Sequence, residues 1–268
     1  LVASGGGPPF GPVLHIWGGG GGGAAGGAPR PTLVINCAAH TAVDAAEKEE
    51  ALSVAINARA PGLIAAAARA AGARMIHVST DFVFDGARST PYPPEAAPSP
   101  LGVYGRTTGD GERAVLAAAP EALVVRTAWV YAAQGRTFVH TMLRLMRERG
   151  AVSVVADQIG TPTWATTLAR ALLGLDAAGA TGVHHATDAG AASWYDFAVA
   201  IAEEALALGL LPAMPVITPI RTQDYPTPAA RPAYSVLDKT STWALLGAPA
   251  PHWRESLRAM LSELKALS

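Results

Sequence analysis

The sequence predicts an α/β protein built on a parallel sheet, with a smaller lobe toward the C-terminal end. From residue 32 onward, short apolar, β-branched runs alternate with alanine-rich helical stretches, a pattern typical of a parallel sheet with right-handed crossovers. The 268 residues are 50% hydrophobic and 15% charged, which supplies enough apolar material for a sizeable core. After about residue 150 the strands become shorter and a proline-rich stretch appears, which indicates a second, smaller lobe.

The first 30 residues differ from the rest of the chain. They hold 12 of the 28 glycines, including an unbroken run from Gly18 to Gly23. A glycine tract has no side chains to bury and much conformational entropy to lose, so we expect an abnormal, loose segment over 1–30. Only VLHIW, residues 13–17, has the pattern of a strand.

The next part of the chain, residues 31–150, predicts one α/β domain. Its expected elements are a strand at 32–36, a helical stretch at 42–71, a strand at 74–79, a loop at 86–100, a helix after Gly109, a strand at 122–131 and a helix at 138–149. We expect the stretch at 42–71 to break near Pro61, which would open a second helix, because proline is tolerated in a first helical turn. Gly72 is a stop signal for that helix.

The second lobe is predicted to span residues 151–268. Its expected elements are a strand near 152–157, a turn at 157–164, a helix at 166–175, a strand at 182–187, a helix at 193–209, loops with short strands at 211–235 and a helix at 252–267. Ser193 is a good N-cap, and Asp196 three residues later makes a near capping box.

Composition excludes several classes of protein. The net charge is −1 and no basic stripe stands out, so we expect no nucleic-acid partner. No apolar run reaches the roughly 20 residues of a membrane span, and residues 1–17 lack the charged region of a signal peptide. The single cysteine, Cys37, cannot form an internal disulfide, which fits a reducing compartment. We therefore expect a cytoplasmic protein.

Two polar motifs follow predicted strands, where ligands bind in an open parallel sheet. NCAAHTAVD (36–44) follows one strand and STD (79–81) follows the next. The alternative is that these residues only cap the following turns. Tyr104 adds a hydroxyl that can deliver a proton to a carbonyl oxygen, although its ordinary pKa of about 10 requires help near neutrality. Its alternative is a packed ring with an exposed tip.

These motifs occur within a longer series, and together the series resembles the dTDP-4-dehydrorhamnose reductase family of extended short-chain dehydrogenases. The matching stretches include VINCAAHTAVDAAEKE (34–49), HVSTDFVFDG (77–86), PLGVYGR (100–106), VVRTAWVY (124–131), DQIGTPT (157–163) and DYPTPAARPAYSVLD (224–238). The resemblance implies a Rossmann-like parallel sheet with helices on both faces that binds the cofactor, over 31–150, and a substrate-binding lobe over 151–268. It also implies reduction, with NADPH or NADH, of the C4 keto group of a dTDP-linked 4-keto-6-deoxy sugar.

The resemblance also assigns roles to individual residues. Thr80 matches the threonine that bonds the substrate oxygen, and Tyr104 matches the proton donor. The residues that it places along the cofactor are Ala38, Ala39, His40, Ser79 and Tyr104, and those that it places at the substrate are Asp81, Phe82, Trp129, Gln158 and Arg231. Arg231 could pair with the diphosphate, but a surface arginine that bonds carbonyls of its own loop is the equal alternative. We expect no metal site, since His184 and His185 lack a third ligand at suitable spacing.

Two departures from the family pattern predict weak or no turnover. Thr108 stands where the family keeps a lysine, four residues after Tyr104, and threonine carries no positive charge. Arg106 should point elsewhere on the helix. The glycine fingerprint that binds the diphosphate is absent from its expected place, because only 24 residues separate Val13 from Asn36 and one βαβ unit needs about 30. We interpret residues 1–30 as a lost, replaced or misread version of that unit.

Other functions stay open at this stage. A non-catalytic binding protein, like the regulatory β subunit of methionine adenosyltransferase, resembles the same family and would tolerate both losses. Another extended short-chain epimerase or dehydratase is weakened by DQIGTPT and PTPAARPAYSVLD, which belong to the reductase pattern. The sequence leaves a homodimer open, as well as the natural sugar and the preference between NADPH and NADH.

Overall fold

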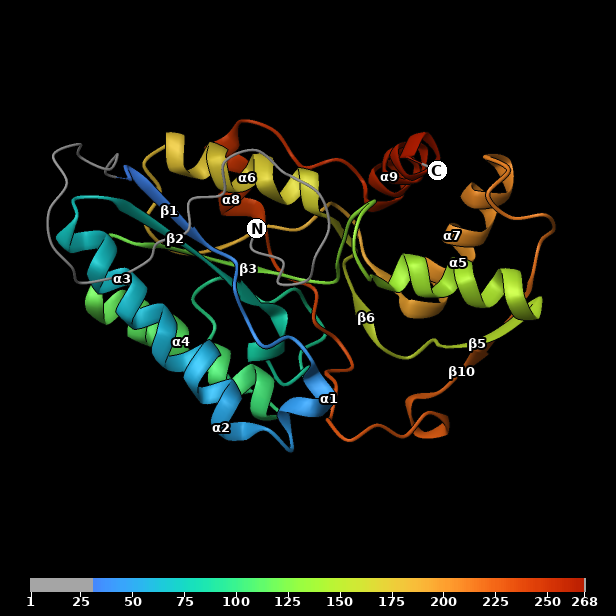
Figure 1. The fold of residues 1–268 in the computed structure, drawn as a ribbon, viewed down its shortest axis with the longest axis horizontal. Helices are drawn as coiled ribbons and strands as arrows, with labels where there is room; N and C mark the ends of the chain where they lie inside the picture. Colours follow the sequence, from blue (N-terminus) through green and yellow to red (C-terminus); the bar gives the residue numbers. More distant parts are fainter. Residues whose placement is uncertain (1–30, 268) are drawn as a thin grey trace, which may run out of the picture.

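The computed structural model describes residues 31–267 and is organised around a four-stranded parallel sheet (Figure 1). Its strands are β1 (Leu33–Asn36), β2 (Arg74–Thr80), β3 (Leu123–Thr127) and β8 (Gly182–His185), in the spatial order β1-β2-β3-β8. Register pairs Ile35 with Ile76, and Val78 with Val125. The parallel α/β fold predicted from the sequence is confirmed. The strand expected at 13–17 and the glycine tract lie outside the described residues.

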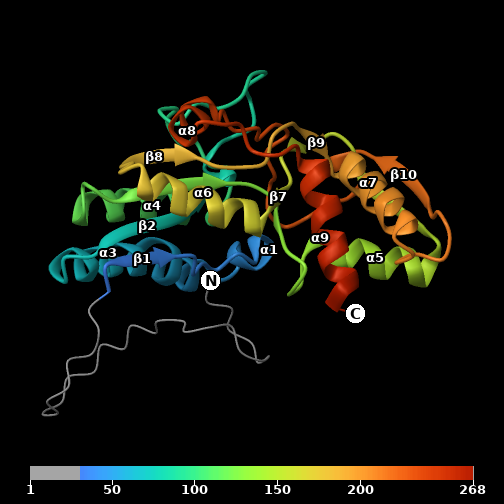
Figure 2. The same cartoon turned by 90° about the horizontal axis from the view of Figure 1, so that it is seen from above.

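Helices cover both faces of this sheet (Figure 2). On one face, side chains of α3 (Ala60–Ala70) and α4 (Val103–Ala118) pack against Met75 and Val124. On the other face, α6 (Ala165–Ala177) packs against Ile76 and Val125. Neighbouring strand residues therefore serve opposite cores, as the two-residue period of a strand requires. This explains why these strands read as continuous apolar runs rather than alternating ones.

The helical stretch before β2 breaks in a different place than predicted. It consists of α1 (Val43–Ala46), α2 (Glu50–Ser53), a π-helix (Val54–Arg59) and α3, so the chain is helical from 50 to 70. The interruption lies between α1 and α2 instead of near Pro61. Pro61 lies in the first turn of α3, directly after the π-helix, where its missing N–H is tolerated. By length and composition, Glu50–Ala70 could cross a membrane, but the buried Ala65 and Ala68 pack in the core beside α4.

Helix α4 begins at Val103, not after Gly109 as predicted. Glycines disfavour a helix in this stretch, but two of them lie where neighbouring backbone comes too close for a side chain. A Cβ at Gly105 would lie 2.0 Å from the carbonyl oxygen of Phe82, and one at Gly111 would lie 2.1 Å from that of Asn57. The first turn is held from outside the helix, because the Glu47 carboxylate accepts the Val103 N–H at 2.8 Å. Tyr104 is thereby placed on the first turn of α4.

The expected strand at 122–131 is divided in two. After β3, the backbone of Trp129 turns into the left-handed region, with φ of 48°, and β4 (Val130–Tyr131) then pairs with β7 (Thr163–Trp164). A non-glycine residue in this region is uncommon, and periodicity within the sequence gives no sign of it. After this turn the chain leaves the main sheet, because β4 pairs with β7 in a separate two-stranded sheet.

The second lobe is built around its own apolar cluster, which includes Phe197 and Leu257. Its elements are α5 (Phe138–Arg149), β5 (Ala151–Val155), β6 (Ile159–Gly160), β9 (Ala192–Ser193), α7 (Trp194–Ala207), β10 (Val216–Ile220), a 3-10 turn (Thr222–Asp224) and α9 (Trp253–Leu267). Strand β10 pairs with β5 in parallel and β9 pairs with β6 antiparallel. The capping box at Ser193 and Asp196 is present as predicted.

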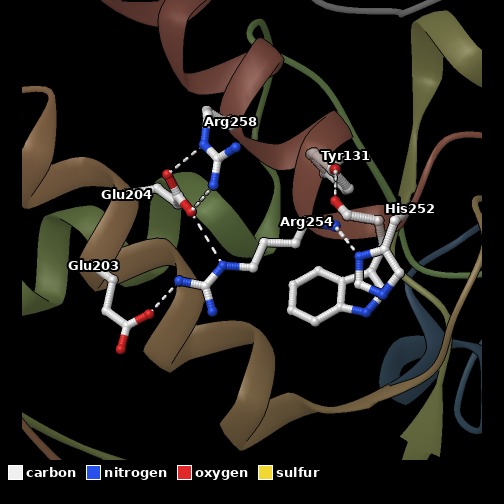
Figure 3. Close-up of polar contacts among 7 residues, drawn as sticks. Tyr131, Glu203, Glu204, His252, Arg254 and Arg258 are labelled. Atoms are coloured by element: carbon white, nitrogen blue, oxygen red, sulfur yellow. Dashed lines mark hydrogen bonds and ion pairs between the residues drawn. The ribbon is translucent and has the colours of Figure 1, made fainter.

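Ion pairs connect α7 to α9 (Figure 3). The largely buried Glu204 carboxylate accepts from Arg258 at 2.9 Å and from Arg254 at 3.1 Å. Arg254 also pairs with the more exposed Glu203. These contacts hold the last described helix against the lobe.

The sheet does not follow the expected boundary at residue 150. Both α6 and β8 come after that residue, yet they belong to the first lobe. Helix α8 (Thr240–Leu246), which the sequence did not predict, returns from the C-terminal part and packs beside α6 and β8. The chain therefore passes between the two lobes more than once.

Candidate active site

The candidate site lies at the carboxyl end of β2. There Thr80 ends the strand and caps the 3-10 turn Asp81–Val83. The Thr80 hydroxyl accepts the Phe82 N–H at 3.2 Å and donates to Oδ1 of Asp81 at 3.1 Å. The capping role considered for this motif is therefore present, and the same hydroxyl also faces the tyrosine described next.

Tyr104 reaches this turn from the first turn of α4. Its ring meets Phe82 edge to face, with centroids 5.5 Å apart, and its hydroxyl lies beside the hydroxyl of Thr80. Burial raises the pKa of Tyr104 to about 12, the contact with Thr80 lowers it, and the charge of Asp81 raises it. The structure thus joins Thr80, Asp81, Phe82 and Tyr104, which the sequence analysis had assigned to one site.

Thr108 lies one helical turn beyond Tyr104 and is buried. Its hydroxyl donates to the backbone oxygen of Tyr104 at 2.8 Å, so it bonds within the helix rather than to the phenol. Arg106 is exposed and pairs with Glu50 at 2.8 Å, pointing away from the phenol as expected. In the described part of the chain, no cation contributes to the shift of the Tyr104 pKa.

Asp81, which the resemblance places at the substrate, is buried in this structure. Its side chain is 2% exposed, and burial raises its pKa to about 6. The nearby Ser235 and Thr80 hydroxyls favour the carboxylate and oppose that rise. A protonated carboxyl is cheaper to bury than a carboxylate, so this group titrates near neutrality instead of at its ordinary pKa.

Ser79 faces away from this group into a buried polar network. Its hydroxyl donates to Glu112, which also pairs with Arg126 through bonds of 2.7 and 2.8 Å. Glu112 and Arg126 are each 4% exposed at their side chains. This pair was not predicted from the sequence, although an arginine within the apolar run of β3 indicates a buried partner.

The loop after β1 was expected to run along the cofactor. Ala38 and Ala39 are exposed there, and the Ala38 N–H donates to the Asn36 side chain at 3.2 Å. The backbone of His40 is held by the buried amide of Asn57, which accepts the His40 N–H at 2.7 Å. Asn57 was not predicted as a site residue, and it sets the shape of this loop from inside the π-helix.

The His40 ring is also bonded on both sides. Its Nδ1 lies 2.9 Å from the Ser53 hydroxyl, and its Nε2 lies 3.3 Å from Glu49. These contacts anchor the loop to α2.

The remaining predicted residues lie in the second lobe and make contacts of their own. The ring of Trp129 stacks on Trp194 with centroids 3.5 Å apart. Gln158 is buried, and its side-chain amide donates to Thr222 at 3.1 Å. No described contact joins either residue to Tyr104 or Thr80.

Arg231 joins the two lobes. Its guanidinium binds the carboxylate of Asp44 on α1 at 2.8 Å, and it donates to the Ala229 carbonyl of its own loop at 3.0 Å. The contact with a carbonyl of its own loop, which was the alternative for this residue, is therefore present. No group of three His, Cys, Asp or Glu side chains suited to a metal lies within residues 31–267.

Comparisons with known proteins agree with this architecture. The family model described as RmlD substrate binding domain matches residues 25–266. A dTDP-4-dehydrorhamnose reductase from Mycobacterium tuberculosis is 47% identical over 237 residues, covering 86% of this chain and 76% of that protein. A probable dTDP-4,6-dihydroxy-2-methyloxan-3-one 4-ketoreductase from Streptomyces antibioticus is 44% identical, covering 88% and 79%.

Solved structures match as well. The crystal structure of dTDP-4-dehydrorhamnose reductase from Bacillus anthracis str. Ames in complex with NADP is 37% identical, with a TM-score of 0.82, and the match covers 87% of this chain and 81% of that one. The similarity therefore extends over nearly all of the described residues.

Proposed function

Because the chain belongs to the dTDP-4-dehydrorhamnose reductase family, we propose that it reduces the C4 keto group of dTDP-4-keto-6-deoxy-L-mannose with NADPH, giving dTDP-L-rhamnose. The observation that carries the proposal is the placement of the Tyr104 hydroxyl beside Thr80 at the carboxyl end of a parallel strand. Ligands bind at such ends in open α/β sheets. In this proposal the first lobe takes the cofactor and the second lobe takes the sugar.

The residues after β1 fit a cofactor at this end of the sheet. Ala38 and Ala39 are small and exposed, so a flat ring can approach the backbone closely. The nicotinamide would supply hydride to the keto carbon. Tyr104 would give its proton to the keto oxygen, and the Thr80 hydroxyl, whose proton can rotate, would turn from Asp81 to polarise that oxygen.

We infer that turnover in this chain is slow. The phenol of Tyr104 has a pKa of about 12 and no cationic neighbour among residues 31–267, so it exchanges its proton reluctantly near neutral pH. General acid–base catalysis typically accelerates a reaction by about 10²–10⁴. We therefore expect turnover to be slower than in a family member that keeps the lysine by a factor no larger than this range.

The test of the proposed function follows NADPH oxidation with the purified chain and the keto sugar, with product identified by mass spectrometry. The sugar named for the Streptomyces relative is offered in parallel, since it differs in the ring but carries a keto group. Tyr104→Phe should abolish the product while Tyr195→Phe, in α7 of the second lobe, should not. Turnover at a rate ordinary for the family would contradict the inferred impairment.

A binding protein without turnover is the second candidate, and the local environment of Tyr104 is the observation that favours it. A partner or ligand-binding role, like that of the methionine adenosyltransferase regulatory β subunit, needs no proton donor. Titrating NADPH and following its fluorescence separates the two functions. Saturable binding with no product favours the binding protein, whereas binding with Tyr104-dependent product favours the reductase.

A further inference from the structure

We propose that Asp81 is a positioning and proton-holding residue, which returns a proton to Tyr104 through the hydroxyl of Thr80. The inference rests on the proposed function and goes beyond it. Asp81 would then act in place of the cationic group that the helix lacks at Thr108. It is not in contact with the substrate in this proposal, and it acts only through Thr80.

The neighbours of the Thr80 hydroxyl define the row of this relay. A hydroxyl has one proton, which can rotate, and two acceptor lone pairs. The Thr80 oxygen lies 3.1 Å from Oδ1 of Asp81, and one lone pair accepts the Phe82 N–H. When Asp81 is ionised, the Thr80 proton goes to Oδ1. When Oδ1 carries a proton, the second lone pair of Thr80 accepts that proton's hydrogen bond, and the Thr80 proton turns to the adjacent Tyr104 oxygen. Tyr104, Thr80 and Asp81 therefore form a continuous row of exchangeable protons.

Within residues 31–267, Asp81 is the only carboxyl group that acts on this row. The titratable side chain that interacts with Asp81 across elements is Tyr104 on α4, and Ser235 contributes a hydroxyl from the segment after Arg231. Oδ2 of Asp81 is buried and has no hydrogen-bond partner in the described structure. A buried carboxylate oxygen without a donor favours the protonated form of the group, which is the form that can give a proton.

The proton balance of the step is complete. Hydride adds to the keto carbon, the Tyr104 O–H bond breaks, and the keto oxygen becomes a hydroxyl, leaving a phenolate. The Asp81 carboxylic acid then donates to Thr80 while Thr80 donates its own proton to the phenolate. Tyr104 is protonated again and Asp81 is left as a carboxylate. After the product leaves, a proton from water protonates Asp81. Because the Tyr104 pKa is about 12 and the Asp81 pKa about 6, the internal transfer is strongly downhill.

The relay predicts a pH dependence that a purely structural role would not produce. The relay can return a proton only while Asp81 is protonated, so steady-state turnover rates should fall about tenfold per pH unit above about pH 6. Asp81→Asn should lower the rate at pH 6 by about tenfold or more with little change in KM, and should remove this slope. The matched control is Asp85→Asn in the same turn region, whose carboxylate bonds Tyr92 instead and should keep the profile. A slope that persists in Asp81→Asn would overturn the relay.

A second measurement decides the relay even if no variant turns over. Infrared difference spectra between pH 5 and pH 8 should show protonated carboxyl absorption from both Asp81 and Asp188, and Asp81→Asn should remove the Asp81 component that Asp85→Asn retains. Thr80→Val should move that titration to higher pH, because it removes a donor to the charged form. Absence of product with the Asp81 component present contradicts only the proposed function. Absence of that component, or a titration that Thr80→Val leaves unchanged, contradicts the relay.

Discussion

The Thr108 side chain shows how one residue changes the chemistry of its neighbour. Its hydroxyl is occupied by the backbone oxygen of Tyr104, so it neither bonds nor charges the phenol one turn away. Burial then dominates and raises the pKa of Tyr104 to about 12. An ammonium in the same place would favour the phenolate and lower that pKa.

We expect Thr108→Lys to lower the pKa of Tyr104 below its present value of about 12 and to raise turnover, by at most about 10²–10⁴. The phenolate titration is read by ultraviolet absorbance, with Tyr104→Phe subtracted to isolate this tyrosine. Thr108→Met is the control, because it has similar length and no charge. Equal titrations in the Lys and Met variants would show that charge at this position does not reach the phenol. A lowered pKa without turnover would locate the defect in cofactor binding.

At the scale of elements, α4 is positioned by backbone contacts that only glycine allows. Gly105 lies against the carbonyl of Phe82 in the 3-10 turn Asp81–Val83, and Gly111 lies against the carbonyl of Asn57 in the π-helix. The helix can therefore lie close to both elements, which places Tyr104 beside Thr80 and packs Thr107 near Asn57. Three glycines weaken the helix intrinsically, so tertiary contacts must hold it.

Gly105→Ala and Gly111→Ala should each lower the free energy of unfolding by about 1–3 kcal/mol, because the added methyl group meets backbone that cannot yield. Gly109→Ala is the matched control in the same helix. Its nearest neighbour would be a Val83 methyl at 3.7 Å, an ordinary contact, so the substitution should be neutral or stabilising by up to about 1 kcal/mol. Urea unfolding measures all three. Equal losses at the three positions would show that helix propensity, not close approach, determines the effect.

Over the whole molecule, two kinds of buried ionisable group determine how stability depends on pH. Buried histidines make the fold less stable as pH falls, and buried aspartates make it less stable as pH rises. Burial lowers the pKa of His77 to about 4 and that of His185 to about 3, so their stabilising contribution is present above pH 6.5 and is lost as pH falls. Burial raises the pKa of Asp81 and Asp188 to about 6, so their contribution is present at low pH and is lost as pH rises through 6. The two pairs oppose each other between pH 5 and 7.

From pH 7 to pH 5, linkage gives a loss of about 2 kcal/mol for each histidine and a gain of about 1.4 kcal/mol for each aspartate. The wild-type chain should therefore lose only about 1 kcal/mol over this interval. His77→Gln removes one of the two histidine losses, so the change in the free energy of unfolding from pH 7 to pH 5 should reverse its sign. The variant should therefore be more stable at pH 5 than at pH 7, whereas the wild-type chain is less stable at pH 5. His252→Gln, at an exposed ring, should leave the dependence as it is. Denaturant unfolding at the two pH values measures the effect, and an unchanged slope in His77→Gln would contradict it.

Much of this fold could be predicted because its signals are local. The strands at 32–36 and 74–79, the helix at 138–149 and the capping box at Ser193 depend on residues close together in the chain. Apolar periodicity and caps act within one or two turns, so the sequence alone was enough to predict these elements and the α/β order to which they belong. The family motifs likewise selected Thr80 and Tyr104 as partners.

How Thr80 and Tyr104 meet depends on contacts between segments that are far apart in the chain. The start of α4 depends on Glu47, 56 residues before Val103, and on the carbonyls that face its glycines. The burial of Asp81, the pairing of Glu112 with Arg126 and the return of β8 and α8 to the first lobe depend on contacts between distant segments. The free-energy cost of burying a charge, or of adding a Cβ where glycine stands, depends on which atoms surround the site. Those atoms come together only when the chain has folded.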